Sequence, residues 1–198
     1  MKKLVHGVGN NDADYRIVND GVHCRYYKKW EGMLRRCYSP FYTNRYPSYR
    51  DCLVCDEWKT FSVFRDWMIQ YESEYDCEIG CHLDKDLLSP SNKLYSPEFC
   101  VLIPASVNTF ITDCSSARGK YPIGVSYSKS KDKFTATCCD PFIGKQITLG
   151  RYNTSLEAHE AWKSRKHDVA VRYSYLQKDP RVSLALRERY KIMHSSKT

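Results

Sequence analysis

Residues 82–108 (HLDKDLLSPSNKLYSPEFCVLIPASVN) constrain the fold of this chain more than any other segment. Acidic residues precede a turn-forming stretch at 89–92, and an apolar run follows at 99–103, a pattern that predicts two strands joined by a turn. Pro104 suits the first turn of a helix, where its missing N–H group costs little, and this helix would carry Asn108. We therefore expect a β-β-α unit.

The same segment places oxygen ligands in order along the chain. Asp84 precedes the turn on the inner strand, and Asn108 stands one turn into the helix. A Mg²⁺ ion takes hard oxygen ligands and keeps several waters while it binds phosphate, so one carboxylate and one amide can suffice. The alternatives are an exposed acid at a strand end and an amide that satisfies backbone groups at a helix start. The segment suggests a site for Mg²⁺ or Mn²⁺ that acts on a phosphodiester.

Charge is distributed unevenly along the chain. Residues 25–50 hold seven Lys and Arg against one acid, whereas residues 51–86 hold ten acids against three Lys and Arg. Residues 163–198 return to ten Lys and Arg against three acids. Two basic flanks around an acidic middle suit a polyanion held on both sides of a metal site, although a solvated surface gives the same pattern. We expect a nucleic acid as the partner.

The sequence predicts a soluble, cytoplasmic protein. No run of eighteen apolar residues is present, so no membrane span is expected. The N-terminus, MKKLVHGVGNND, lacks the apolar core of a signal peptide. Without a secretion signal, the ten cysteines are expected to be reduced thiols.

Four of these cysteines form two close pairs, Cys52-x-x-Cys55 and Cys77-x-x-x-Cys81. Such pairs can build a tetrahedral Zn²⁺ site, but the same spacing is not diagnostic and buried thiols also explain it. We favour buried thiols over structural zinc.

The second half of the chain predicts an antiparallel sheet packed on a helix, which makes the expected fold class α+β. Thr154 and Glu157 form the capping box of a helix, and Pro180 begins a final one that runs to about Met193. Turn-like segments separate the expected strands, at 124–127, 134–138 and 146–150.

Composition shifts predict how the chain divides. A helix is expected from about Cys24 to Tyr38, and another from the N-cap Thr60 to about Tyr71. Small and polar residues at 113–121 indicate a linker. The expected parts are a flexible arm (1–20), a first domain (21–112), the linker (113–121), a second domain (122–175) and a basic C-terminal helix (176–198).

Two resemblances rest on short motifs in a fixed order. The first part of the chain resembles phage HNH endonucleases, and the second part resembles AP2-type DNA-binding domains, which are often joined to such nucleases. Together the resemblances cover about residues 25–175. The HNH-like motifs are WEGM (30–33), RCY (36–38), PSY (47–49), CLVCDEW (52–58), Phe61, LDKDLL (83–88), NK (92–93), YSPE (95–98) and Asn108, and the AP2-like ones are GV (124–125), LG (149–150), Thr154 and EA (157–158).

The HNH resemblance implies a ββα-metal (His-Me finger) core that cuts double-stranded DNA with a divalent ion, inside the bacterial host cell if the chain is phage-encoded. By position, Asp84 would be the carboxylate ligand and Asn108 the ligand on the helix. Lys85 stands where most of the family has the His that activates water, and Phe99 stands where it has the middle Asn. The rival hypotheses are a DNA-binding protein on a nuclease scaffold that no longer cleaves, and a small zinc-stabilised interaction protein.

Because Lys85 stands in place of the usual His, the sequence does not identify the general base. A lysine is a poor base unless it is buried, so phosphate contact is the expected role of Lys85, against a solvated surface position. His82 shares a strand face with Asp84, and an imidazole is a side chain suited to base catalysis. A surface histidine at a strand start is the alternative. The resemblance implies Tyr49 as the second candidate, since related nucleases with an altered motif are thought to supply a phenol from this loop.

The AP2 resemblance implies that the exposed face of the sheet lies in the major groove of DNA. We expect no arginine on this face, so Gln146 reading adenine is the expected base contact. Lys129, Lys131, Lys133 and Lys145 are expected to bind phosphates, which makes affinity fall with salt. The alternative is a small sheet that binds nothing. The face is predicted to carry Ser126, Ser128, Lys133, Thr135, Thr137, Gln146 and Thr148.

Overall fold

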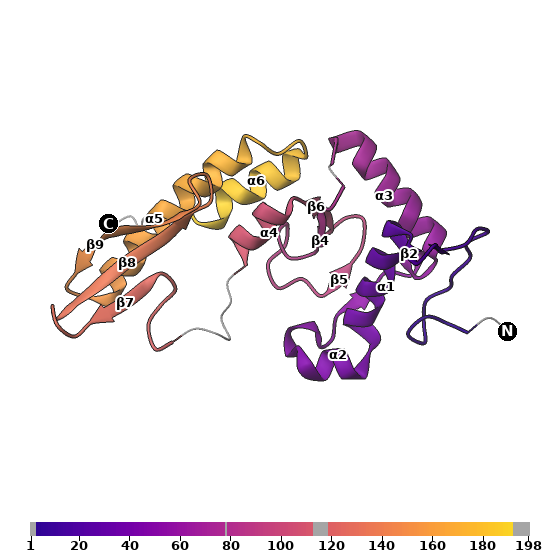
Figure 1. The fold of residues 1–198 in the computed structure, drawn as a ribbon, viewed down its shortest axis with the longest axis horizontal. Coiled ribbons are helices and arrows are strands. Elements are labelled where there is room, and N and C mark those ends of the chain that lie inside the picture. The colour runs from indigo at the N-terminus through magenta and orange to yellow at the C-terminus, as the bar shows by residue number, and fades with distance from the viewer. Residues whose placement is uncertain (1–2, 78, 113–118, 192–198) are drawn as a thin grey trace, which may run out of the picture. The chain divides into compact units, whose positions relative to one another are not determined.

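The computed structural model describes residues 3–77, 79–112 and 119–191 (Figure 1). Helices and short strands alternate, and the predicted α+β class is confirmed. The chain forms two compact units, Met1–Pro104 and Ala105–Thr198. The boundary between the units, after Pro104, precedes the expected linker (113–121). Residues 113–118 of that linker lie outside the described residues. No helix among the described residues is long and apolar enough to cross a membrane.

The first unit combines three α-helices and short strands with two 3₁₀ turns, η1 and η2. Its strands are two or three residues long, so tertiary packing rather than extended pairing defines the unit. In chain order the elements are β1 (Val18–Asn19), β2 (Val22–His23), α1 (Arg25–Tyr38), α2 (Pro40–Arg45), η1 (Pro47–Tyr49), β3 (Leu53–Val54), η2 (Glu57–Lys59), α3 (Phe61–Tyr75), β4 (His82–Asp84), β5 (Leu94–Tyr95) and β6 (Val101–Ile103).

Helices α1 and α3 supply the core of this unit, and both predicted helices are confirmed. Trp30 on α1 is fully buried, and its ring centre lies 5.5 Å from that of Phe61 on α3. The indole Nε1 of Trp30 donates a 2.7 Å hydrogen bond to the carbonyl oxygen of Trp58. Helix α3 extends four residues beyond the predicted end and stops where Asp76 adopts a left-handed conformation.

Part of the expected flexible arm (1–20), around Gly9 and Asn10, contacts the rest of the first unit. The amide of Asn10 donates to the carbonyl of Lys59 (2.8 Å), and the amide of Phe61 donates to the carbonyl of Asn10 (3.0 Å). A Cβ at Gly9 would lie 2.3 Å from Cδ1 of Leu34, so only glycine fits this close approach. Backbone bonds and a glycine therefore attach this part of the segment to the unit, which its polar composition did not indicate.

The predicted strand pair around the 89–92 turn is present. Strands β4 and β6 are antiparallel, with His82 opposite Ile103 and Asp84 opposite Val101. The sequence did not predict the parallel pairing of β5 with β3, in which the amide of Cys55 donates to the carbonyl of Tyr95 (2.9 Å). Two-residue strands carry no periodicity, which is why the pattern missed them.

The second unit has the predicted three-stranded antiparallel sheet, in the order β7-β8-β9. The capping box is also confirmed, since Thr154 Oγ1 accepts from the amide of Glu157 at 3.2 Å and the Glu157 carboxylate accepts from the amide of Thr154. The last helix begins at Pro180 as predicted but ends at Arg189, before the expected end at about Met193, and residues 192–198 lie outside the described residues. The elements are α4 (Ala105–Ile111), β7 (Val125–Ser128), β8 (Lys133–Asp140), β9 (Lys145–Tyr152), α5 (Ser155–Ser174) and α6 (Pro180–Arg189).

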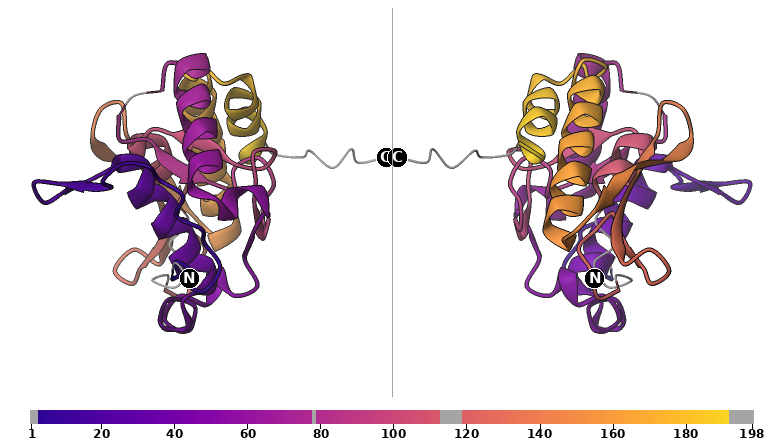
Figure 2. Two further views of the ribbon diagram at one scale, coloured as in Figure 1. Left: turned by 90° about the vertical axis from the view of Figure 1, so that its right-hand side faces the viewer. Right: turned by 90° about the vertical axis from the view of Figure 1, so that its left-hand side faces the viewer.

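Helix α5 covers one face of this sheet (Figure 2). Ala136 and Cys138 on β8 point into the interface and are buried. Trp162 on α5 lies against Gly124, where a Cβ would come within 1.9 Å of the indole. Helix α5 does not cover the opposite face of the sheet, which is called the open face below.

Helix α4 belongs to the second unit because both later helices bind its carboxyl end. Lys166 Nζ on α5 donates to the carbonyl of Phe110 (2.7 Å) and lies 3.7 Å from the centre of its ring. Arg189 on α6 donates to the carbonyl of Ile111 (3.1 Å). Cations at a helix C-terminus satisfy its last carbonyls and complement its dipole. The expected domain 21–112 had placed this helix with the strands before it.

Candidate active site and nucleic-acid surface

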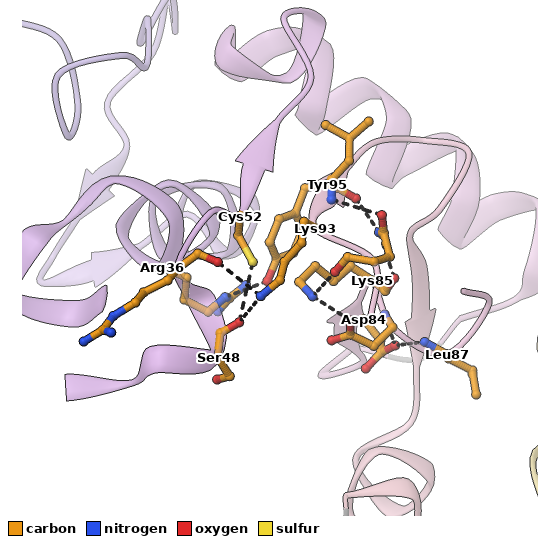
Figure 3. A network of polar contacts seen from close by, with 12 residues as sticks. Arg36, Ser48, Cys52, Asp84, Lys85, Leu87, Lys93 and Tyr95 are labelled. Atoms are coloured by element: carbon orange, nitrogen blue, oxygen red, sulfur yellow. Dashed lines mark hydrogen bonds and ion pairs between the residues drawn. The ribbon is translucent and has the colours of Figure 1, made fainter. Parts of the chain in front are cut away.

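Asp84 ends strand β4 with a fixed carboxylate (Figure 3). Its Oδ1 accepts hydrogen bonds from the backbone amides of Asp86 (2.9 Å) and Leu87 (2.6 Å), which makes an Asx turn. An ionised carboxylate has about four acceptor positions, so two amide bonds orient it without exhausting its capacity. The chemistry of this group fits a hard cation such as Mg²⁺.

Lys85 is buried rather than placed on the surface, with 5% of its area exposed. Its ammonium group donates to Asp86 Oδ1 and to the carbonyl oxygen of Asn92, both at 2.6 Å. The Nζ atom also lies 5.9 Å from the centre of the Tyr95 ring. This inward placement does not favour the predicted phosphate contact, because the charge is already satisfied inside the unit.

Asn92 closes the turn that the Lys85 side chain spans. Its Nδ2 donates to the carbonyls of Lys85 (3.0 Å) and Leu94 (2.6 Å), while its Oδ1 accepts from the amide of Leu94 (3.0 Å). Side chain and backbone therefore lock the segment between β4 and β5. The sequence signal was present, since asparagine is common in turns, but its partners were not predictable.

Replacing Lys85 tests a structural role against a phosphate-binding one. We expect Lys85→Ala to lower the unfolding free energy of the first unit by about 2–4 kcal/mol, through a cavity and an unsatisfied carbonyl. Lys85→Met should retain more stability because it fills the same volume. Hydrogen exchange of segment 82–103 reports the loss. If Lys85→Ala keeps the wild-type stability but lowers the salt dependence of DNA binding, Lys85 is a phosphate contact instead.

The two candidate bases differ in their surroundings. His82 is the first residue of β4 and is exposed, two residues before Asp84 and hence on the same strand face. Tyr49 in η1 is half-buried, and burial raises the pKa of its phenol, an effect that Arg36 opposes. A neutral phenol is a weaker base near pH 7 than an imidazole. His82 is therefore the better placed of the two.

Asn108 lies in the middle of α4, within the second unit. The main-chain carbonyl oxygen of Asn108 accepts a 2.7 Å hydrogen bond from the hydroxyl of Thr112. The helix position matches the sequence prediction. Its role as a metal ligand stays a prediction from the sequence.

The four cysteines of the zinc hypothesis remain as two separate pairs. Burial raises the pKa of the Cys52 and Cys55 thiols, and a hydrogen bond with Cys81 raises that of Cys77. Over the described ranges, no group of three or more His, Cys, Asp or Glu side chains is arranged to hold a metal. The geometry therefore gives no support to a four-cysteine zinc site.

The open face of the second unit's sheet carries the predicted polar residues. The register pairs Ser126 with Thr135 and Thr137 with Thr148, which places all four on the face opposite α5. Gln146 also lies there, and its Nε2 donates to Thr137 Oγ1 (3.0 Å). The remaining predicted members of this surface are Ser128 and Lys133 on the strands, and Lys129 and Lys131 in the β7–β8 turn. Lys145 instead pairs with Asp140, whose side chain faces α5, so this exposed lysine lies at the start of β9 on the other side of the sheet.

A β-bulge adds an arginine that the sequence prediction had excluded from this face. The register shifts between Ala136 and Thr137, so that Thr135 pairs with Arg151 instead of Gly150. Directly paired residues share a face, and Arg151 is exposed. The predicted strand ended at Gly150, so Arg151 was not among the residues assigned to a face, and strict alternation extended by one residue would place it on the opposite side. The open face therefore has a donor suited to guanine or to phosphate.

Both candidate regions are defined by this chain's own geometry. Comparison with family models, curated proteins and solved structures found no match to this chain. A functional interpretation therefore rests on the residues and their contacts.

Proposed function

We propose that this chain is a metal-dependent DNA endonuclease of the HNH type, with Asp84 as a ligand of Mg²⁺ or Mn²⁺. One observation carries the proposal. Asp84 ends one strand of the antiparallel β4–β6 pair, and its carboxylate is oriented by the amides of Asp86 and Leu87. A well-oriented carboxylate at the end of a short antiparallel strand pair suits a one-metal phosphodiesterase site.

The chain's own residues would divide the chemistry as follows. A divalent ion bound at Asp84 would neutralise charge on the phosphate and on the leaving oxygen. His82, exposed on the same strand face, would accept a proton from the attacking water at one ring nitrogen. Asn108 is proposed as a second oxygen ligand on the sequence prediction alone.

The second unit would hold the DNA. Its open face presents Arg151 and Gln146 among small hydroxyl side chains, and exposed lysines line its edges. Lysines that bind phosphate give affinity without sequence preference, whereas arginine and glutamine read base edges. This division of roles predicts binding that weakens steeply with salt.

The runner-up function is DNA binding without cleavage. The observation that favours it is Lys85, which occupies the position of the usual catalytic base but whose ammonium group is engaged by Asp86 and by the carbonyl of Asn92. In this case the first unit would act as a scaffold. The open sheet face would carry the activity.

Supercoiled plasmid separates the two functions. The protein is incubated with plasmid in Mg²⁺ or Mn²⁺, and a parallel gel shift in EDTA measures binding. The nuclease proposal predicts nicked or linear product that requires the metal. Plasmid that stays supercoiled at every protein concentration, while the gel shift persists, would contradict the nuclease proposal and support DNA binding without cleavage.

A further inference from the structure

Arg36 is held between two tyrosine rings in the first unit. It lies in the last turn of α1, where a cation complements the helix dipole. Its Nε donates a 3.2 Å hydrogen bond to the hydroxyl of Tyr95. The centre of the guanidinium lies 5.7 Å from the Tyr95 ring centre and 5.9 Å from that of Tyr49. Tyr95 also connects this site to the Asp84 turn, because Lys85 Nζ lies near its ring (Figure 3).

The charge of Arg36 has no counter-ion in the part of the chain that the structure describes. Arg25 and Arg165, also part-buried, each bind a carboxylate at 2.6 Å, from Glu72 and Asp140. Arg36 instead binds the hydroxyl of Tyr95, and burial raises the pKa of that hydroxyl well above its ordinary value. The phenol therefore stays neutral and orients the guanidinium without neutralising it.

The surroundings add positive charge rather than remove it. Lys93 Nζ binds the carbonyls of Ser48 (2.9 Å) and Arg50 (3.1 Å), two neutral acceptors. Asp86, which acts on the pKa of Tyr49, is already ion-paired with Lys85 at 2.6 Å. A half-buried guanidinium without a counter-ion is costly, and a guanidinium has five N–H donors, of which Tyr95 engages one. This arrangement is suited to an incoming anion.

We propose that Arg36, oriented by Tyr95 and Tyr49, binds a backbone phosphate of the DNA on the first unit. Guanidinium groups stack on aromatic rings and bind phosphate through paired N–H donors, so a tyrosine-held arginine is preorganised for this contact. The inference rests on the DNA-binding part of the proposed function. It adds a phosphate contact in the unit that carries Asp84, separate from the open sheet face.

Salt dependence of DNA affinity tests the proposal in the full-length protein. Fluorescence anisotropy with a labelled duplex in EDTA measures binding without cleavage. Arg36→Gln should weaken binding by about tenfold, as expected for a hydrogen bond to a charged group. It should also reduce the slope of log K against log salt by about 0.9, the value for one phosphate. Lys28→Gln, the same charge change at an exposed position of α1, should leave the slope unchanged.

Two further arms distinguish the alternatives. Arg36→Lys keeps the charge and should keep the slope while lowering affinity, which tests the proposal even if Arg36→Gln does not fold. Inorganic phosphate, titrated at constant ionic strength, should not displace DNA more than chloride does. Unchanged affinity in both Arg36 variants, or an equal loss in Lys28→Gln, would overturn the proposal. Phosphate binding that depends on Arg36, in a protein whose DNA affinity is unchanged by Arg36→Gln, would assign the site to free phosphate instead. A wild-type protein that binds no DNA would refute the DNA-binding part of the proposed function. The binding measurement does not depend on cleavage, so a protein that binds DNA without cutting it still tests the role of Arg36.

Discussion

Gly124→Ala is expected to destabilise the second unit by about 2–5 kcal/mol. Gly124 has φ +79°, which costs an L-residue about 1–2 kcal/mol, and its added Cβ would lie 1.9 Å from Cδ1 of Trp162. Trp162 is 6% exposed and packed beneath the sheet, so relieving the overlap requires α5 or β7 to move. Hydrogen exchange of β7–β9 reports this loss without requiring both units to unfold together.

Gly144 supplies the matched control for this substitution. It also has positive φ (+62°), but among the described residues nothing lies within 4 Å of the place that an added Cβ would take. Gly144→Ala should therefore cost only the backbone term, about 1 kcal/mol. Equal effects at both positions would show that the contact with Trp162 is not tight, and would contradict the packing described for α5.

Asp140→Ala is expected to cost the second unit about 3–5 kcal/mol. This carboxylate is 1% exposed at the end of β8, and its Oδ2 binds Arg165 at 2.6 Å and Arg172 at 3.5 Å, both on α5. Its Oδ1 accepts from the amide of Phe142 (2.9 Å), which shapes the β8–β9 turn. Removing the carboxylate leaves Arg165, Arg172 and the backbone amide of Phe142 without their shared acceptor.

The control for Asp140 is an exposed aspartate on α5. Asp168→Ala changes the same charge, and we expect its effect to stay within about 0.5 kcal/mol. Denaturant unfolding followed by hydrogen exchange of β8 and α5 compares the two variants. A small effect of Asp140→Ala would mean that water solvates Arg165 and Arg172 as well as the carboxylate does. In that case Asp140 does not anchor the sheet to α5.

Long periodic or capped elements were predictable from the sequence. Helices α1 and α5 began within a residue of their predicted starts, because apolar spacing and a capping box are local signals. The strands of the second unit were also predicted, because turn-forming residues separate them. The short β3–β5 pair was not, since its partners are far apart in the sequence.

The candidate site was predictable in type but not in orientation. The sequence placed Asp84 at a strand end and Asn108 on a helix, as observed. The burial of Lys85 depends on Asn92 and Asp86 folding back over it, which no local pattern reveals. Arg151 was missed because a bulge reverses the alternation on which the face prediction depended. Arg36 was recognised only as part of a motif, because its two tyrosines come from separate segments.

Cleavage of supercoiled plasmid by wild type and Asp84→Asn tests the nuclease proposal most directly. Asparagine retains the side-chain oxygen that accepts from the amides of Asp86 and Leu87, but it removes the charge that would bind the metal. We expect the Mg²⁺-dependent rate to fall at least about 100-fold, because loss of even an outer-shell partner costs 10–100-fold. DNA affinity in EDTA should be unchanged. Cleavage by Asp84→Asn at the wild-type rate would contradict Asp84 as the metal ligand.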